Sequence, residues 1–335
     1  MCASAQLARA DLASSRDKFL AGDYKTAIAE LGKVTGKDRS AARVVLARAL
    51  IATGDYPAAE QTLTPIANAK GDPNAIEAHL VLDQLRAETG RSADARRDLE
   101  QLLKDHPDDR AIRTTLGILR HDQGDMVNAK ALFDATIQEF DKKKLDLNDA
   151  EQLFELAEAA RYTSQFELAN DSYRAAWALA TQVQPGKQGP PAINAKPQLL
   201  ASNLSWAQLF SQKYASELAA QTIEEVFKIN PNDPDAHADM ASIITDTSYD
   251  LQAVHHHLET ALGVNPKNAT ALKVRASLEI DQNQWDVARA TLDQVLAVNK
   301  EDVEAIAMKA TVAWLRDDTK AYEQLRQQAL AIDPA

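Results

Sequence analysis

The chain has 335 residues, of which 45% are hydrophobic and only 5% aromatic, and its formal net charge is −12. The sequence has no run of about 18 apolar residues, so it encodes no transmembrane helix. Most of the negative charge lies in residues 201–335, with 20 acidic and 11 basic side chains. This acidity disfavours nucleic acid or an anionic membrane surface as a partner. It either serves solubility as a hydrated face or suits a basic or neutral partner.

Helical hairpins with glycine turns begin the chain. Each of the first four units has an apolar helical run, a turn, and a second run with an alanine on its inner face; the turns begin at Gly22, Gly54, Gly90 and Gly124. Glycine readily adopts the positive φ that the end of a helix favours. The pattern therefore predicts four consecutive hairpins.

A fifth hairpin is predicted over residues 147–183, with a degenerate turn at Ser164. Residues 184–197 then concentrate proline and glycine, which is not a helical composition. We interpret this stretch as an inter-repeat loop. It divides the chain into residues 1–183, with units one to five, and residues 198–335, with units six to nine.

The second half of the chain has a fixed period. One phrase, an apolar residue followed by Asn or Asp and usually by Pro, recurs at steps of 35, 34 and 34 residues; its polar members are Asn230, Asn265, Asn299 and Asp333. A period near 34 indicates a repeat array in which each unit packs on its neighbours. We therefore expect an all-α solenoid of about nine hairpins.

The turn phrases, the small residues on both helices and the proline before the next unit resemble the tetratricopeptide repeat. The resemblance implies a right-handed superhelix that binds proteins or peptides and has no catalytic activity. Residues 206–240 and 298–334 also resemble arrays that precede a zinc-peptidase-like domain in some bacterial secreted proteins. An alternative is thus the recruiting or regulatory N-terminal segment of a larger bacterial enzyme, possibly a metallopeptidase, cut at residue 335.

Partner contacts are expected on the concave face, because the family lines that face with the first helix of each hairpin. Counting from the small alanine on the second helix of each hairpin gives the positions expected on this face. They are Arg16, Phe19, Arg48, Thr114, His121, Glu158, Arg161, Trp206 and Lys273. Arginine pairs with carboxylates and tryptophan offers a large contact area, so the set could hold an extended peptide of acidic character. Alternatively, the aromatic members belong to the core.

Catalytic and metal-binding patterns are missing from the sequence. His255, His256 and His257 are adjacent, and neighbouring helix residues point about 100° apart, so the three cannot ligate one ion. There is no Gly-x-Ser-x-Gly turn, no His-Glu-x-x-His motif and no phosphate-binding loop. We expect no enzyme activity, no metal and no cofactor.

The two ends of the chain suggest two further hypotheses. Cys2 is the sole cysteine, and its position resembles the lipidated first residue of a mature bacterial lipoprotein; this would place the protein in the periplasm or at the outer membrane, and otherwise it is cytoplasmic. The array ends where a tenth unit would start, which suggests a longer native protein. An uncapped final helix could also pair two copies of the chain.

Overall fold

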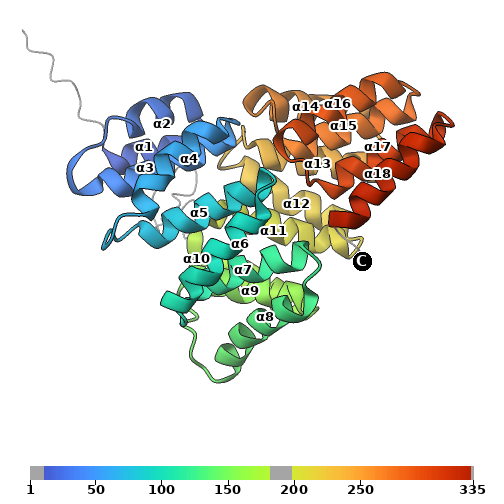
Figure 1. Cartoon of the computed structure of the whole chain (residues 1–335). Coiled ribbons are helices and arrows are strands. Elements are labelled where there is room, and N and C mark those ends of the chain that lie inside the picture. The colour runs from blue at the N-terminus through green and yellow to red at the C-terminus, as the bar shows by residue number, and fades with distance from the viewer. Residues whose placement is uncertain (1–10, 182–197, 333–335) are drawn as a thin grey trace, which may run out of the picture.

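The computed structural model describes residues 11–181 and 198–332, and within these ranges it contains helices and no strands (Figure 1). Nine hairpins follow one another. They pair α1 (Leu12–Leu20) with α2 (Tyr24–Leu31), α3 (Arg39–Ala52) with α4 (Tyr56–Ala67), α5 (Ala75–Glu88) with α6 (Ser92–Asp105), α7 (Arg110–Asp122) with α8 (Met126–Asp141), α9 (Ala150–Tyr162) with α10 (Phe166–Ala180), α11 (Gln198–Gln212) with α12 (Ser216–Phe227), α13 (Pro234–Thr247) with α14 (Leu251–Val264), α15 (Ala269–Asp281) with α16 (Trp285–Val298), and α17 (Val303–Leu315) with α18 (Thr319–Ile332). A short 3-10 turn, Gly36–Asp38, precedes α3. The expected all-α solenoid of nine hairpins is confirmed.

Three expectations fall on residues outside these ranges. They concern Cys2, the loop at 184–197 and the last phrase at Asp333. The two groups of repeats that flank the loop pack on each other through α10 and α11. Ala180 and Leu200 belong to one buried apolar cluster at this junction.

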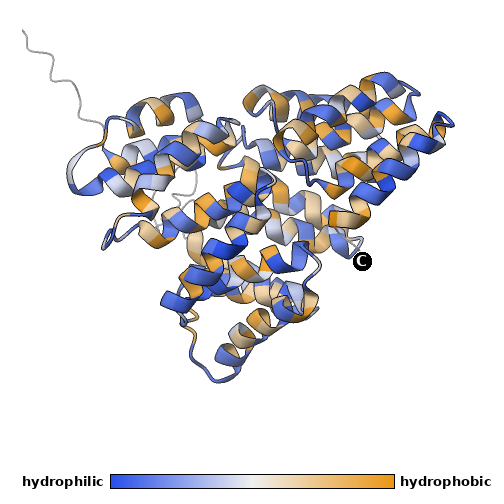
Figure 2. Ribbon diagram, in the orientation of Figure 1, coloured by the Kyte–Doolittle hydropathy of each residue, from blue (hydrophilic) through white to orange (hydrophobic). Residues whose placement is uncertain are grey.

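Buried small residues set the spacing between helices. The residue five positions after each turn is fully buried in units one to eight, and it is alanine in seven of them: Ala27, Ala59, Ala95, Ala129, Ala169, Ala219 and Ala288, with Val254 in unit seven. Four residues further on, a large apolar side chain such as Leu31 or Leu63 is equally buried. Small residues at the contact let the helices approach closely. Figure 2 shows hydrophobic and hydrophilic residues alternating along the helices, as this one-sided packing requires.

The ninth unit departs from this pattern. Tyr322 and Arg326 take the two positions that are buried elsewhere, and α18 has no buried residue among Thr319–Ile332. Trp314, at the end of α17, is 62% exposed and packs its ring on Tyr322. Self-association through this end of the array stays a prediction.

The superhelix curves until its first units lie beside its last ones. In Figure 1 the N-terminal hairpins approach α13 to α16, although hydrogen-bonded residues of the two regions are 206 to 213 positions apart along the chain. Three turns of the first units meet three inter-unit phrases of the last units, at Gly22 with Asn230, Gly54 with Asn265, and Gly90 with Asn299. We call these three contacts the clasp.

Hydrogen bonds hold the first two contacts of the clasp. Asn230 Nδ2 donates to the Tyr24 hydroxyl at 2.9 Å, and Asn232 Nδ2 donates to the Gly22 carbonyl at 3.4 Å. One unit later, Asn265 Nδ2 donates to the Tyr56 hydroxyl at 3.3 Å, and Lys267 Nζ donates to the Gly54 carbonyl at 2.9 Å. The same two repeated phrases therefore meet twice, in the same way.

The asparagine of each phrase is shaped by its own backbone. The Oδ1 of Asn230, Asn265 and Asn299 accepts the amide N–H of the residue two positions on, at 3.2, 3.0 and 2.8 Å. This local turn is a common role of asparagine. It leaves the Nδ2 of the first two free to bond the tyrosines across the clasp.

Candidate functional site

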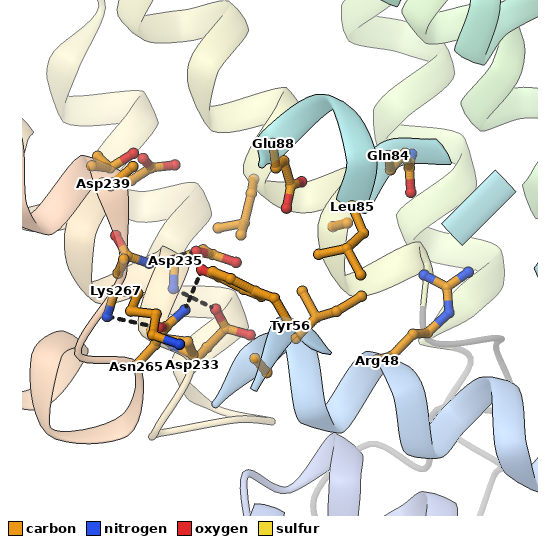
Figure 3. A pocket seen from close by; sticks show the side chains of 18 of the residues that line it. Arg48, Tyr56, Gln84, Leu85, Glu88, Asp233, Asp235, Asp239, Asn265 and Lys267 are labelled. Carbon is orange, nitrogen blue, oxygen red and sulfur yellow. Dashed lines mark hydrogen bonds between the residues drawn. The ribbon is translucent and has the colours of Figure 1, made fainter. Parts of the chain in front are cut away.

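A cavity of about 590 Å³ lies inside the closed superhelix, next to the clasp (Figure 3). Its walls come from the first helices of units two, three, six, seven and eight together with the clasp turns. The polar and aromatic lining includes Phe19, Tyr24, Arg48, Tyr56, Gln84, Glu88, Ser205, Gln208, Asn230, Asp233, Asp235, Asp239, Asn265, Lys267, Asn268, Thr270, Asn299 and Asp302. Its volume lies within the range of roughly 300–1,000 Å³ that is usual for ligand pockets.

Among the residues that the structure describes, five carboxylates and two cations line this cavity. Both cations are already engaged by the protein: Arg48 Nη2 lies 3.4 Å from Glu77 Oε1, while Lys267 Nζ bonds the Gly54 carbonyl and lies 5.4 Å from the centre of the Tyr56 ring. Neither cation forms a hydrogen bond to a carboxylate of the cavity among the described residues. Asp302 lies 3.6 Å from Lys273, which is outside the lining, and among the described residues no cation lies within 4 Å of the other four carboxylates. The charge of the lining is therefore negative.

The carboxylates differ in how firmly the protein holds them. Asp233 caps α13 and accepts the amide N–H groups of Asp235 and Ala236, at 3.1 and 3.0 Å. Asp235 Oδ1 accepts from Asn268 Nδ2 at 2.7 Å. These two carboxylates have structural duties that fix their positions.

Glu88 and Asp239 are held loosely or not at all. Within the described part of the chain no donor bonds the Glu88 carboxylate, and Asp239 Oδ2 has one long contact, 3.4 Å from Gln208 Nε2. Figure 3 shows Glu88, on α5, and Asp239, on α13, with Asp235 around the same space. Their oxygens are available to a ligand in the cavity.

Enclosure and mutual repulsion raise the pKa values of these acids. Burial is the larger cause and the charge of Asp235 the next, and together they raise the pKa of Glu88 to about 7 and that of Asp239 to about 7. The same causes raise the pKa of Asp233 to about 7. Glu88 and Asp235 are exposed to water, while Asp233 and Asp239 are half-buried, so the protein around the cavity removes only part of their hydration. Near neutral pH the group therefore titrates, and a cation would favour its charged form.

Two models of the tetratricopeptide repeat match the sequence, one over residues 18–85 and 248–312 and the other over residues 84–143. The chain is a tetratricopeptide repeat protein. No sequence among curated proteins matches it. In structure it is similar to a chain of the crystal structure of the APC/C hetero-tetramer Cut9–Hcn1, with a TM-score of 0.58 and 16% identity over 92% of this chain and 56% of that chain. This chain thus spans little more than half the length of that solved chain, and the likeness shows the fold alone.

Tetratricopeptide repeats form scaffolds for protein interaction, and this chain has that architecture throughout its described residues. None of its described helices combines the length and apolar character needed to cross a bilayer. Within residues 11–181 and 198–332, no three His, Cys, Asp or Glu side chains are placed to hold a metal ion.

Two of the nine side chains expected to face a partner of this tetratricopeptide repeat protein line the cavity, Phe19 and Arg48. Phe19 is partly buried and packs edge-on against Tyr24, with ring centres 5.9 Å apart. Arg48 is paired with Glu77 as described above. The other seven lie outside the cavity lining.

Four of the remaining seven are buried or paired near units four and five. Thr114 and Glu158 are 5% and 2% exposed, and Glu158 Oε1 accepts from the Tyr173 hydroxyl at 2.7 Å. Arg161 lies 3.9 Å from Glu158 and donates to Gln208 at 3.3 Å. His121 Nδ1 lies 3.3 Å from an Asp122 oxygen.

The last three have partners of their own. Arg16 lies 3.9 Å from Asp17. Trp206 Nε1 donates to Asn170 Oδ1 at 3.0 Å, and its ring packs on the core of units four and five. Lys273 pairs with Glu304 and lies 3.6 Å from Asp302.

The adjacent histidines meet a fourth one that the sequence did not connect with them. His237 Nε2 lies 3.0 Å from the Pro231 carbonyl, which can only accept, so this nitrogen carries the proton. His237 Nδ1 then accepts from His257 Nδ1 at 2.8 Å. Both rings are neutral, and burial followed by the neighbouring histidines lowers the pKa of His257 to about 4.

Proposed function

We propose that this tetratricopeptide repeat protein is a scaffold that binds a segment of a partner protein carrying Lys or Arg, with the cationic side chain inside the cavity. The observation that carries the proposal is the charge imbalance of the described lining: four carboxylates without a cationic partner, besides Asp302 beside Lys273, against two lining cations that are bound elsewhere. A cationic group placed there would gain charge-assisted hydrogen bonds from oxygens that now have few partners.

The ion pairs of three arginines that were expected to face a partner also favour a basic partner over an acidic one. Arg16, Arg48 and Arg161 each have a carboxylate within 4 Å. An acidic peptide would have to displace these ion pairs, whereas a basic one meets Glu88 and Asp239 without displacing a cation. Phe19, which also lines the cavity, offers an apolar surface for the aliphatic stem of Lys or Arg.

The titration of the cavity carboxylates also makes partner binding depend on pH. The pKa values of Glu88 and Asp239 are raised to about 7 in the free protein, and a bound cation would lower them. Binding therefore releases protons, and the affinity rises with pH through about 7. A neutral peptide bound by backbone contacts alone would show no such dependence.

The test uses fluorescein-labelled Gly/Ser decapeptides with one central Arg, compared with peptides that carry neutral citrulline instead. We expect fluorescence anisotropy to show tighter binding of the Arg peptide, and Glu88→Gln/Asp239→Asn to lower its affinity at least tenfold. The control is Glu167→Gln/Asp171→Asn on α10, which removes the same charge from exposed positions outside the cavity. Equal binding of the two peptides, or equal loss in both double variants, contradicts the proposal.

A further inference from the structure

The cavity depends on the clasp, because the two sides of the clasp supply opposite walls. Tyr24 and Tyr56 come from the first two hairpins, and Asn230 and Asn265 come from the phrases before units seven and eight. All four line the cavity, and two hydrogen bonds join its walls: Asn230 to Tyr24 and Asn265 to Tyr56. If the two sides separate, the enclosed site ceases to exist.

The glycines of the clasp leave room for the asparagines that approach them, in addition to adopting the positive φ of the turn. All nine hairpin turns have a residue with φ between +53° and +77°, and in units five to nine that residue is Ser164, Tyr214, Tyr249, Asn283 or Asp317. A side chain is thus compatible with the turn itself. At Gly22 and Gly54, however, an added Cβ would collide with Oδ1 of Asn230 and Asn265, and at Gly90 it would lie 2.8 Å from Oδ1 of Asn299.

The clasp is small compared with the packing inside each hairpin. Among the described residues four hydrogen bonds join its two sides, and Leu20 and Phe19 of the first hairpin pack in one apolar cluster with residues of units six and seven. Each hydrogen bond favours the closed form roughly fivefold, so the four together favour it on the order of several hundredfold, and the apolar contact adds to this. Opening would break no bond within a helix, so it requires far less than unfolding of the array.

We propose that the clasp is a latch: it opens without unfolding the repeats, and a cationic partner in the cavity holds it closed. The second half of this inference rests on the proposed function, since only a ligand that touches both walls distinguishes the closed form from the open one. Linkage then requires the reverse effect, so weakening the clasp weakens binding of the partner. A variant that is open nine-tenths of the time would bind about tenfold more weakly.

The latch is tested by pulsed electron–electron double resonance between nitroxides at Lys25→Cys and Lys228→Cys, both exposed positions, in a Cys2→Ser background. Gly22→Ala/Gly54→Ala should add a longer and broader distance population. Gly36→Ala/Gly71→Ala is the matched control, since these glycines have φ of +77° but nothing within 4 Å of an added Cβ. It should keep the parent distribution.

A second variant guards against misfolding of the alanine pair. Tyr24→Phe/Tyr56→Phe removes two clasp hydrogen bonds without adding an atom. Because the two remaining bonds still favour the closed form, it should add only a minor population at longer distance while far-ultraviolet circular dichroism stays unchanged. Distances equal to the parent in both clasp variants, or equal broadening in the control, overturn the latch.

The linkage is tested with the Arg decapeptide. Gly22→Ala/Gly54→Ala should bind it more weakly than the control, by about tenfold where its clashes keep the clasp open nine-tenths of the time, whereas Tyr24→Phe/Tyr56→Phe, which stays mostly closed, should bind it nearly as tightly as the parent. Saturating peptide should return the distances of both variants to the closed value. Peptide that binds Gly22→Ala/Gly54→Ala and the control equally, although the distances show the alanine pair to be open, overturns the linkage while the proposed function stands. Peptide that binds no variant, the parent included, overturns the proposed function and the linkage together, and the distances alone then decide on the latch.

Discussion

The hydrogen bond between Tyr24 and Asn230 offers a direct energetic test of the closed superhelix. The two residues are 206 positions apart, both are buried, and their side chains meet at 2.9 Å. Contact between units one and seven is not expected in an array where each repeat packs only on its neighbours. A coupling energy between these residues in solution would therefore report the closure itself.

The expected magnitudes follow from the partners of each side chain. Tyr24→Phe removes one hydrogen bond and should cost about 1 kcal/mol. Asn230→Ala also removes the bond to Asp233 Oδ2 and the local turn to Asn232, and it leaves a buried hydroxyl unpaired, so it should cost about 2–4 kcal/mol. Since the shared bond can be lost only once, the coupling energy should be about 0.5–1.5 kcal/mol.

Urea unfolding followed by circular dichroism, with the two single variants and the double variant, gives this coupling. Tyr24→Phe combined with Asn299→Ala is the control pair, because Asn299 belongs to another contact of the clasp, and the two costs should add. If the first cycle is also additive to within the error of the measurement, the turn of unit one does not contact unit seven and the closed superhelix is refuted.

Three further predictions concern titration and buried polar groups. Asp235→Asn should lower the pKa of Glu88 from about 7 toward its ordinary value, though only in part because burial is the larger cause; carboxyl-carbon NMR titration measures it, and an unchanged pKa contradicts the proposed repulsion. The pKa of His257 is lowered to about 4, so the contribution of its neutral form to stability is complete above the unfolded pKa of about 6.5 and is lost as pH falls toward 4. His257→Gln should therefore reduce the decrease in unfolding free energy between pH 7.5 and 4.5 by about 1–2 kcal/mol, measured by urea unfolding. An equal decrease in the parent and the variant would refute the assignment. Tyr173→Phe should destabilise the fold by about 1–3 kcal/mol, because Glu158 is 2% exposed and loses its donor; an unchanged thermal midpoint would show that the carboxylate finds another donor.

The architecture could be predicted from the sequence because its signals are local. The glycine turns, the alanines five residues later and the period near 34 all report contacts within a hairpin or between neighbours. The sequence also showed the two kinds of segment that form the clasp, the glycine turns such as that at Gly22 and the repeated phrases such as that at Asn230. Their meeting was not, because it depends on the accumulated curvature of six units, which no single repeat encodes.

The candidate site was predicted less well for the same reason. Two residues of the predicted partner-binding set, Phe19 and Arg48, line the cavity, but register could not show that Arg48 is paired with Glu77. Glu88 and Asp239 were missed because each is one acid among many on its own helix. Only the closure of the superhelix brings them to one space, where partial loss of hydration and the charge of Asp235 raise their pKa values.

Site-specific photo-crosslinking tests the central claim, partner binding inside the closed superhelix, most directly. A benzophenone amino acid replaces Gln84, which lines the cavity and reaches water, or Val127, which is 82% exposed at the start of α8. In native extract we expect Gln84 to crosslink a partner through a segment that contains Lys or Arg, and Val127 to give no such product. A partner crosslinked from Val127 and not from Gln84 would place recognition on the outer surface and contradict the account.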